Sequence, residues 1–211
     1  MQAQKTRVRH AALCFFLLAV AAIVWTAAER REQEPEELTN YAALGNSFAR
    51  ISSGRAEVFS ASGELAYAVD CGAERLEPCG EAAAAWSPGG RLVFLGAGGY
   101  REAGTHGELL GVFGSESGAA CALWLGPDGA RVSVYGAAGE AAHICPGDGI
   151  FPLAAAISPR LDAAAVLGAD SEGYVLLEYS LPGLELRASA RLDSPAYTLI
   201  WGEDGPRAVE L

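Results

Sequence analysis

The part of the chain after residue 40 has only two histidines for acid–base chemistry. They are His106, in a glycine-flanked loop, and His143, near the end of a predicted strand. Nucleophilic catalysis needs a nucleophile, a base and an orienting group, and the sequence has no G-x-S-x-G elbow. Ser87 and Ser158 each precede a proline in a turn-forming run, which favours a structural role. We therefore predict no catalytic residue, and we expect both histidines to face solvent or to cap a strand.

The usual metal and cofactor motifs are also missing. H-E-x-x-H, paired C-x-x-C and EF-hand spacings do not occur. Asp148 lies in a Pro-Gly-Asp-Gly run, which is typical of a turn rather than of a calcium site. The glycine run before Arg101 begins like a dinucleotide fingerprint, but Arg101 replaces the third glycine and no helical pattern follows. The sequence therefore predicts no metal site and no cofactor.

Four of the five cysteines lie after the N-terminal apolar run, and an even number permits two disulfides with three connectivities. Pairing of Cys71 with Cys79 would close a short loop. Pairing of Cys121 with Cys145 would join one repeat to the next. The alternative, four free thiols, remains open.

Short β-strands must position these side chains. From about residue 48 onward, apolar stretches alternate with glycine and proline turns, and no convincing run has helical spacing. Val132–Tyr135 alternates in polarity, and runs such as Pro127-Asp128-Gly129 are typical of tight turns. The pattern predicts antiparallel β-meanders.

Four segments of about ten residues repeat one pattern, a large apolar residue followed by a Pro/Gly/Asp turn and a second strand. The leading residues are separated by 38, 33 and 44 positions, which is the size of a propeller blade. A four-stranded blade buries its faces only by stacking on its neighbours, so we expect the leading side chains between adjacent sheets. These residues are Trp86, Trp124, Ile157 and Trp201.

The run Trp86–Phe94, WSPGGRLVF, resembles the W-S-P-D-G repeat of WD40-like, TolB-type β-propellers. Ile157 is followed by the same Ser-Pro, and residues 127–129 keep the Pro-Asp-Gly. The resemblance implies an all-β fold, a small or partial propeller of about four blades over residues 44–211. Propellers of this kind mostly scaffold protein contacts, and a minority carry enzymes. The layout is also similar to single-pass proteins of Gram-positive bacteria.

The last repeat has one hairpin, after Trp201, whereas strands within residues 47–70 have no leading motif before them. We expect these N-terminal strands to complete the blade of Trp201 and to close the ring. An open stack of sheets is the alternative.

The N-terminus predicts a membrane anchor. Residues 1–10 carry three basic residues and no acid, and residues 11–28 are almost entirely apolar. As a helix this run is roughly 27 Å long, close to the hydrocarbon core of a bilayer. We predict a cytoplasmic basic tip at 1–10, a transmembrane signal anchor at 11–28, a charged linker at 29–43 and an extracytoplasmic domain at 44–211. A cleaved signal peptide is the alternative, although the apolar run is longer than usual for one.

Charge and composition exclude some classes of partner and of structure. The net charge of −11 and the lack of a basic stretch after the N-terminus argue against a nucleic-acid partner, and 51% hydrophobic residues argue against extended disorder. We expect a single-pass cell-membrane protein whose exported domain binds a protein or another envelope ligand. The alternative is an envelope hydrolase with loop carboxylates meeting near the axis, the candidates being Glu102, Asp148, Asp170 and Glu172.

Overall fold

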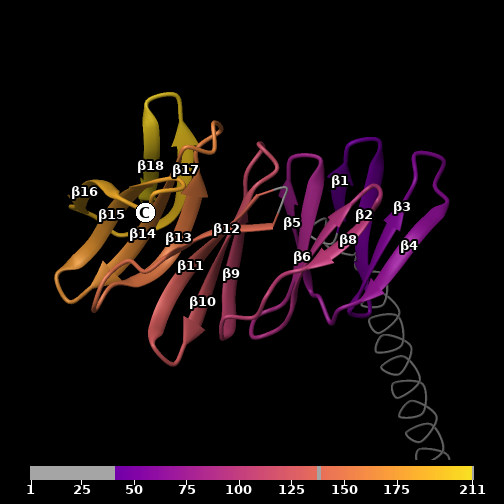
Figure 1. Ribbon diagram of the computed structural model, residues 1–211, viewed down its shortest axis with the longest axis horizontal. Helices are drawn as coiled ribbons and strands as arrows, with labels where there is room; N and C mark the ends of the chain where they lie inside the picture. Colours follow the sequence, from indigo (N-terminus) through magenta and orange to yellow (C-terminus); the bar gives the residue numbers. More distant parts are fainter. Residues whose placement is uncertain (1–40, 137–138, 211) are drawn as a thin grey trace, which may run out of the picture. The chain divides into compact units, whose positions relative to one another are not determined.

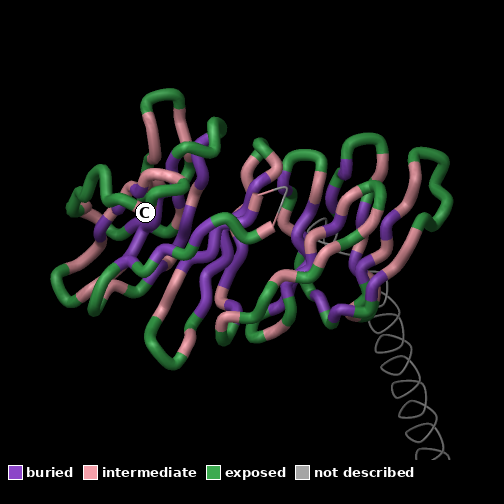
Figure 2. Tube along the Cα trace, in the orientation of Figure 1, coloured by how far each residue is buried: buried purple, intermediate pink, exposed green. Residues whose placement is uncertain are grey.

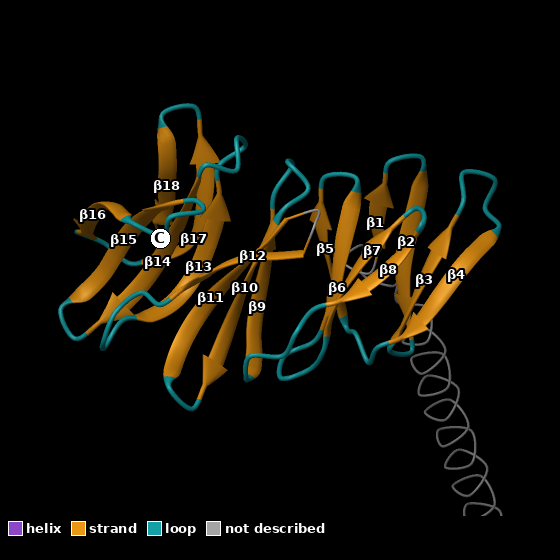
Figure 3. Cartoon of the chain, viewed as in Figure 1, coloured by secondary structure: helices purple, strands orange, loops and turns teal. Residues whose placement is uncertain are grey.

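The computed structural model describes residues 41–136 and 139–210, where the regular elements are all β-strands (Figure 1 and Figure 3). These residues belong to one compact unit, residues 38–211. The predicted anchor at residues 11–28 lies outside the described residues. Within the described ranges, no helix has the length and apolar character needed to cross a membrane.

The strands form four four-stranded antiparallel sheets and a final hairpin, and in each sheet consecutive strands pair in chain order. Sheet 1 contains β1 (Tyr41–Leu44), β2 (Ser47–Ser52), β3 (Arg55–Phe59) and β4 (Leu65–Asp70). Sheet 2 contains β5 (Arg75–Cys79), β6 (Ala82–Trp86), β7 (Leu92–Gly96) and β8 (Gly99–Glu102). Sheet 3 contains β9 (Glu108–Gly114), β10 (Ala120–Gly126), β11 (Gly129–Gly136) and β12 (Gly139–Ile144). Sheet 4 contains β13 (Phe151–Ile157), β14 (Ala163–Asp170), β15 (Gly173–Ser180) and β16 (Leu186–Leu192), and sheet 5 contains β17 (Ala196–Gly202) and β18 (Gly205–Glu210). The predicted all-β class of antiparallel meanders is confirmed.

Each sheet packs on the next, so the core consists of four apolar layers between neighbouring sheets. Strand β6 shows how one strand serves two layers. Ala83 and Ala85 face sheet 1, whereas Ala84 and Trp86 face sheet 3. Because both faces are covered, the inner strands are apolar at nearly every position and lose the alternation of a half-exposed strand. Buried residues run along the middle of the strands, and exposed ones gather at the hairpin ends (Figure 2).

The four leading residues do not occupy equivalent positions. Trp86 and Trp124 lie before the hairpin that joins the second and third strands of sheets 2 and 3. Ile157 and Trp201 lie before the hairpin that joins the first and second strands of sheets 4 and 5. The sequence motif therefore marks a type of hairpin, and its position shifts by one strand between the two halves of the unit.

The prediction that strands within residues 47–70 complete the sheet of Trp201 is wrong. Strands β2, β3 and β4 pair with β1 and with one another, and β17 and β18 pair only with each other among the described strands. The reason is β1, whose four residues begin at Tyr41, inside the segment predicted as a linker. Because β1 supplies the fourth strand, β2–β4 already belong to a complete four-stranded sheet without the strands of the last hairpin.

Candidate functional site

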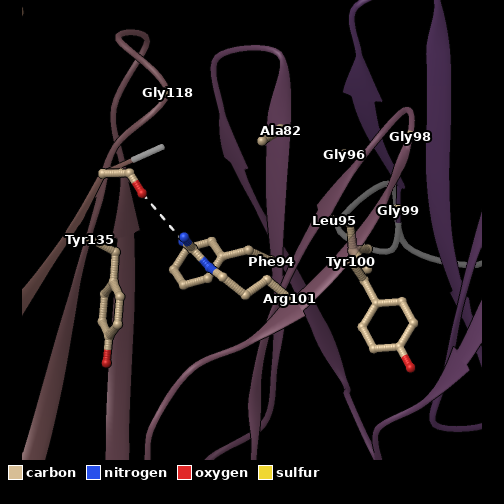
Figure 4. Close-up of a pocket in the computed structure, with 11 residues that line it drawn as sticks. Ala82, Phe94, Leu95, Gly96, Gly98, Gly99, Tyr100, Arg101, Gly118 and Tyr135 are labelled. Atoms are coloured by element: carbon tan, nitrogen blue, oxygen red, sulfur yellow. Dashed lines mark hydrogen bonds between the residues drawn. The ribbon is translucent and has the colours of Figure 1, made fainter. Parts of the chain in front are cut away.

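A hollow of about 370 Å³ lies between sheets 2 and 3, with the β7–β8 hairpin on one side and the end of β11 on the other (Figure 4). We call it the sheet 2–3 groove. Aromatic rings, an arginine and the small residues of the hairpin turn line it. Tyr100 belongs to the hairpin that lines the groove, but its side chain points away from Arg101 (Figure 4), and its ring lies 6.2 Å from that of Tyr67 in sheet 1. The groove therefore offers aromatic and cationic surface together, which protein interfaces favour.

Arg101 bridges the two walls of the groove. Its Nη2 donates a hydrogen bond of 3.2 Å to the carbonyl oxygen of Gly136, and its guanidinium lies 5.4 Å from the ring centre of Phe94 (Figure 4). The ring of Phe94 in turn lies 5.1 Å from that of Tyr135. Side chains from β7, β8 and β11 therefore hold one another in place by a cation–π and an aromatic contact.

Tyr67 supports the hairpin of the groove from sheet 1. Its hydroxyl lies 2.6 Å from the carbonyl oxygen of Gly96 and 2.7 Å from that of Gly99, the two ends of the β7–β8 turn. Burial raises the pKa of Tyr67, because the phenolate would lose its hydration. The hydroxyl therefore stays a donor over the physiological range and fixes the turn.

Besides the groove, the structure brings together His106, from the β8–β9 connection, with Glu140 and His143, from β12. We call these three residues the histidine cluster. Nε2 of His106 is 3.0 Å from Oε1 of Glu140, and Nε2 of His143 is 3.3 Å from the same oxygen. The two imidazole rings meet edge to face with centroids 4.6 Å apart. His106 is half-buried and Glu140 and His143 are exposed, so the cluster lies at the surface and is reachable from solvent.

A β-bulge explains how Glu140 and His143 meet. In a regular strand, residues three positions apart point to opposite faces. In β12 the pairing shifts, with Tyr135 opposite Glu140 but Val134 opposite Ala142, so Ala141 is an extra residue. The bulge brings Glu140 and His143 to one face. His106 reaches them from the connection between β8 and β9 and places its ring edge to face on Trp124, with centroids 5.7 Å apart.

Two buried hydroxyls of β11 lie behind the cluster. Ser133, which is fully buried, has its Oγ 3.1 Å from Nδ1 of His143. Tyr135 is also buried, and its hydroxyl has no partner at ordinary hydrogen-bonding geometry in the described ranges. It lies near enough to Glu140 to respond to it: burial first, and then the charge of Glu140, raises the pKa of Tyr135 to about 12.

Two imidazoles and one carboxylate are a donor set that binds divalent transition metals. Within the part of the chain that the structure describes, these three residues form the group of His, Cys, Asp or Glu side chains that could hold a metal ion. Their potential ligand atoms all lie within 4.8 Å of one another. In the sequence, no motif joins His106 to His143. The Glu-x-x-His spacing of Glu140 and His143 was the available signal, but without the bulge it predicts opposite faces.

Ser87 and Ser158 are both buried, each at the start of a hairpin turn. Oγ of Ser158 donates to Oδ1 of Asp162 at 2.6 Å and accepts from the backbone N–H of Asp162 and of Ala163. Ser87 lies in the turn between β6 and β7, where its carbonyl accepts from the N–H of Gly90 at 3.0 Å. Both positions show the geometry of a turn former.

The four cysteines within the described residues are free thiols, and Cys145 is the exposed one among them. Burial, and then the nearby charge of Glu77, raises the pKa of Cys79 to about 12, and burial likewise raises the pKa of Cys121. Thiols with such pKa values are poor nucleophiles at neutral pH. Cys71, Cys79 and Cys121 therefore act as small apolar core residues in this state.

The four loop acids of the alternative hydrolase site do not gather in one place. Glu102 pairs with Arg91 in sheet 2, whereas Asp170 and Glu172 both pair with Arg191 in sheet 4. Asp148 lies in the connection before β13 and lines a different hollow of about 460 Å³. No described group of three such ligand atoms contains any of these acids.

No protein-family model matches the sequence, and no curated protein does. Solved structures match in fold. Hydrazine synthase of Kuenenia stuttgartiensis has a TM-score of 0.55 at 10% identity, over 82% of this chain and 56% of that one. The Swd1 β-propeller domain of Myceliophteria thermophila has a TM-score of 0.53 at 11% identity, over 79% and 59%. The fold is β-propeller-like. A chain of a mitotic checkpoint complex also matches, with a TM-score of 0.54 at 13% identity over 79% and 54%. This propeller-like chain thus spans between 54% and 59% of the length of these three chains.

Proposed function

We propose that this chain is a membrane-anchored protein-interaction module, whose propeller-like domain lies outside the cytoplasm and binds a protein partner through the sheet 2–3 groove. The observation that carries the proposal is the propeller-like stack of meanders. Such a stack positions loops and inter-sheet grooves on a rigid frame, as binding proteins require. The membrane anchor at residues 11–28 and the TolB-type likeness of the hairpin motif belong to this proposal.

Two similar structures support the class of function. One is the β-propeller domain of Swd1, and another is a chain of a mitotic checkpoint complex, which is an assembly. The groove adds a local argument. It presents Phe94 and the guanidinium of Arg101 on one surface, and aromatic and arginine side chains are enriched where proteins bind one another.

The envelope hydrolase is the less supported candidate. Its four loop acids pair locally or lie apart, and Ser133, the serine beside His143, is fully buried and so out of reach of a substrate. The likeness to hydrazine synthase concerns the fold alone.

Substitution in the groove tests the proposed binding surface. Full-length protein is captured from detergent-solubilised membranes, with Arg101→Ala as the test and Arg187→Ala as the matched control. Arg101 lines the groove, whereas Arg187 lies on β16, outside the groove. We expect one co-purifying partner to be lost with Arg101→Ala and kept with Arg187→Ala. Equal recovery with both variants would contradict the groove as the binding surface.

The proposed location has its own test in Cys145. This thiol is exposed, whereas Cys71, Cys79 and Cys121 are buried. A membrane-impermeant maleimide added to intact cells should label the wild-type protein and leave Cys145→Ser unlabelled. Labelling of the wild type only after lysis would place the domain inside the cell and overturn this part of the proposal.

A further inference from the structure

We infer that His106, Glu140 and His143 form a binding site for one divalent transition-metal ion, for which Zn²⁺ is the best match. The inference is independent of the protein partner proposed above. It rests on three observations. Three donor groups from two separate segments lie close together, the hydroxyls of Ser133 and Tyr135 lie next to them, and solvent can reach them.

The distances suit a metal centre. Two ligands that each lie about 2.1 Å from a tetrahedral ion are separated by about 3.4 Å. The Nε2 atoms of His106 and His143 lie 3.0 Å and 3.3 Å from Oε1 of Glu140, close to that separation. All the potential ligand atoms are within 4.8 Å of one another, so the two imidazoles need only a small rotation to enclose an ion.

Ser133 supplies the support that metal-binding imidazoles generally have. A histidine that binds a metal through one ring nitrogen usually donates from the other to an oxygen, which fixes the tautomer and the ring. Oγ of the fully buried Ser133 lies 3.1 Å from Nδ1 of His143. With Nδ1–H donating to Ser133, the lone pair of Nε2 points toward His106 and Glu140, where the ion would bind.

Tyr135 gives a second, independent indication of a ligand. Its hydroxyl is buried without a partner at ordinary hydrogen-bonding geometry, and it interacts electrostatically with Glu140. A buried hydroxyl without a hydrogen-bond partner destabilises the folded state. Such a group therefore usually has a function, or it bonds to a water or to a side chain that binds an ion. Once Glu140 binds an ion with one oxygen, Tyr135 is placed to donate to the carboxylate.

The exposure of the three side chains allows an ion to enter and leaves one coordination position free. The exposed fractions are 21% for His106, 27% for Glu140 and 43% for His143. Trp124 closes the buried side beneath His106. Three protein ligands with a fourth position for water are the arrangement that two histidines and a glutamate adopt around Zn²⁺ in catalytic sites.

The competing explanation is an ion-pair cluster in which Glu140 simply joins two histidines. Metal titration separates the two. The full chain is purified in detergent without a polyhistidine tag, stripped with a chelator and titrated first with Co²⁺ and then with Zn²⁺. We expect one equivalent of Co²⁺ to give visible absorption bands and one equivalent of Zn²⁺ to abolish them.

Single substitutions identify the ligands. His106→Gln, Glu140→Gln and His143→Gln should each weaken Zn²⁺ binding by more than about 100-fold, and Ser133→Ala by about 10-fold. Glu172→Gln, an exposed carboxylate of sheet 4, is the matched control and should leave the affinity unchanged. Circular dichroism of the stripped proteins verifies that each variant folds, and the exposed His143 is the substitution that the fold should tolerate most easily.

Two results would overturn the site. One is the failure of the wild-type protein to bind either ion at one equivalent. The other is binding that persists unchanged in folded Glu140→Gln and His143→Gln, which would place the ion elsewhere on the chain.

Discussion

At the scale of single residues, close approach of backbones decides which positions tolerate change. Gly114, at the end of β9, is an example. A β-carbon there would lie 1.8 Å from the carbonyl oxygen of Pro78 and 3.1 Å from Sγ of Cys79, both in sheet 2. The packing of sheets 2 and 3 therefore requires a residue without a side chain at this point.

Gly114→Ala should destabilise the domain by about 1–3 kcal/mol, because the added methyl group must push one sheet away from the other. Gly98→Ala is the control, since its β-carbon would meet nothing within 4 Å. It should change the free energy of unfolding by less than about 0.5 kcal/mol. Urea unfolding of both variants gives the comparison, and equal stability of the two would contradict the close packing of sheets 2 and 3.

Glu77 illustrates a charge held at the same interface. Its Oε1 accepts a hydrogen bond of 3.1 Å from the backbone N–H of Gly114. Burial raises the pKa of the Glu77 carboxyl, and the hydrogen bond from Gly114 offsets part of this rise. Because the folded protein binds this proton more tightly than the unfolded chain, Glu77 favours folding most at low pH. That contribution is lost as the pH rises through the folded-state pKa.

Glu77→Gln should therefore raise the melting temperature at pH 7 relative to the wild type and give no such gain at pH 4. The amide keeps an oxygen acceptor for Gly114 and carries no charge to desolvate. Thermal unfolding followed by circular dichroism at the two pH values measures the difference. A larger gain at pH 4 than at pH 7 would show that the sign is wrong.

At the scale of elements, hairpins and a bulge position the groups that matter. The β13–β14 hairpin depends on Ser158, whose Oγ contacts Asp162 and Ala163. The hydrogen bond from Ser158 lowers the pKa of the Asp162 carboxyl. The bulge at Ala141 similarly determines that Glu140 and His143 share one face.

Ser158→Ala should cost about 1–3 kcal/mol of folding free energy, because the backbone N–H groups of Asp162 and of the buried Ala163 lose their acceptor. The pKa of Asp162 should rise toward its usual value in this variant, which an NMR titration can follow. Ser189→Ala, on the exposed outer strand β16, is the control and should change neither quantity. An unchanged Asp162 titration in Ser158→Ala would contradict the hydrogen bond.

At the scale of the whole molecule, the sequence predicted the class of structure better than its arrangement. Short strands, glycine turns and the spacing of the tryptophans were enough to predict antiparallel meanders with propeller-like stacking. The phase of the repeat was not predictable, because a Trp-Ser-Pro hairpin is locally similar wherever it lies in a four-strand meander. Trp86 and Ile157 therefore look equivalent in sequence but lie in different hairpins.

The candidate sites depended on features with no local signature. The sheet 2–3 groove joins Arg101 of β8 to Gly136 of β11, which are 35 residues apart. The histidine cluster needs the pairing shift in β12 and the approach of the β8–β9 connection. Both arise from the packing of two meanders, which alternation of polarity within each strand does not reveal.

Site-specific photocrosslinking in living cells shows whether a protein partner binds in the sheet 2–3 groove. A photoreactive phenylalanine analogue replaces Arg101 in one strain and Arg187 in another, and crosslinked products are separated by mass. A partner in the groove predicts a discrete protein adduct at position 101 and none at position 187. No adduct at either position, or the same adduct at both, would contradict a binding surface in the groove.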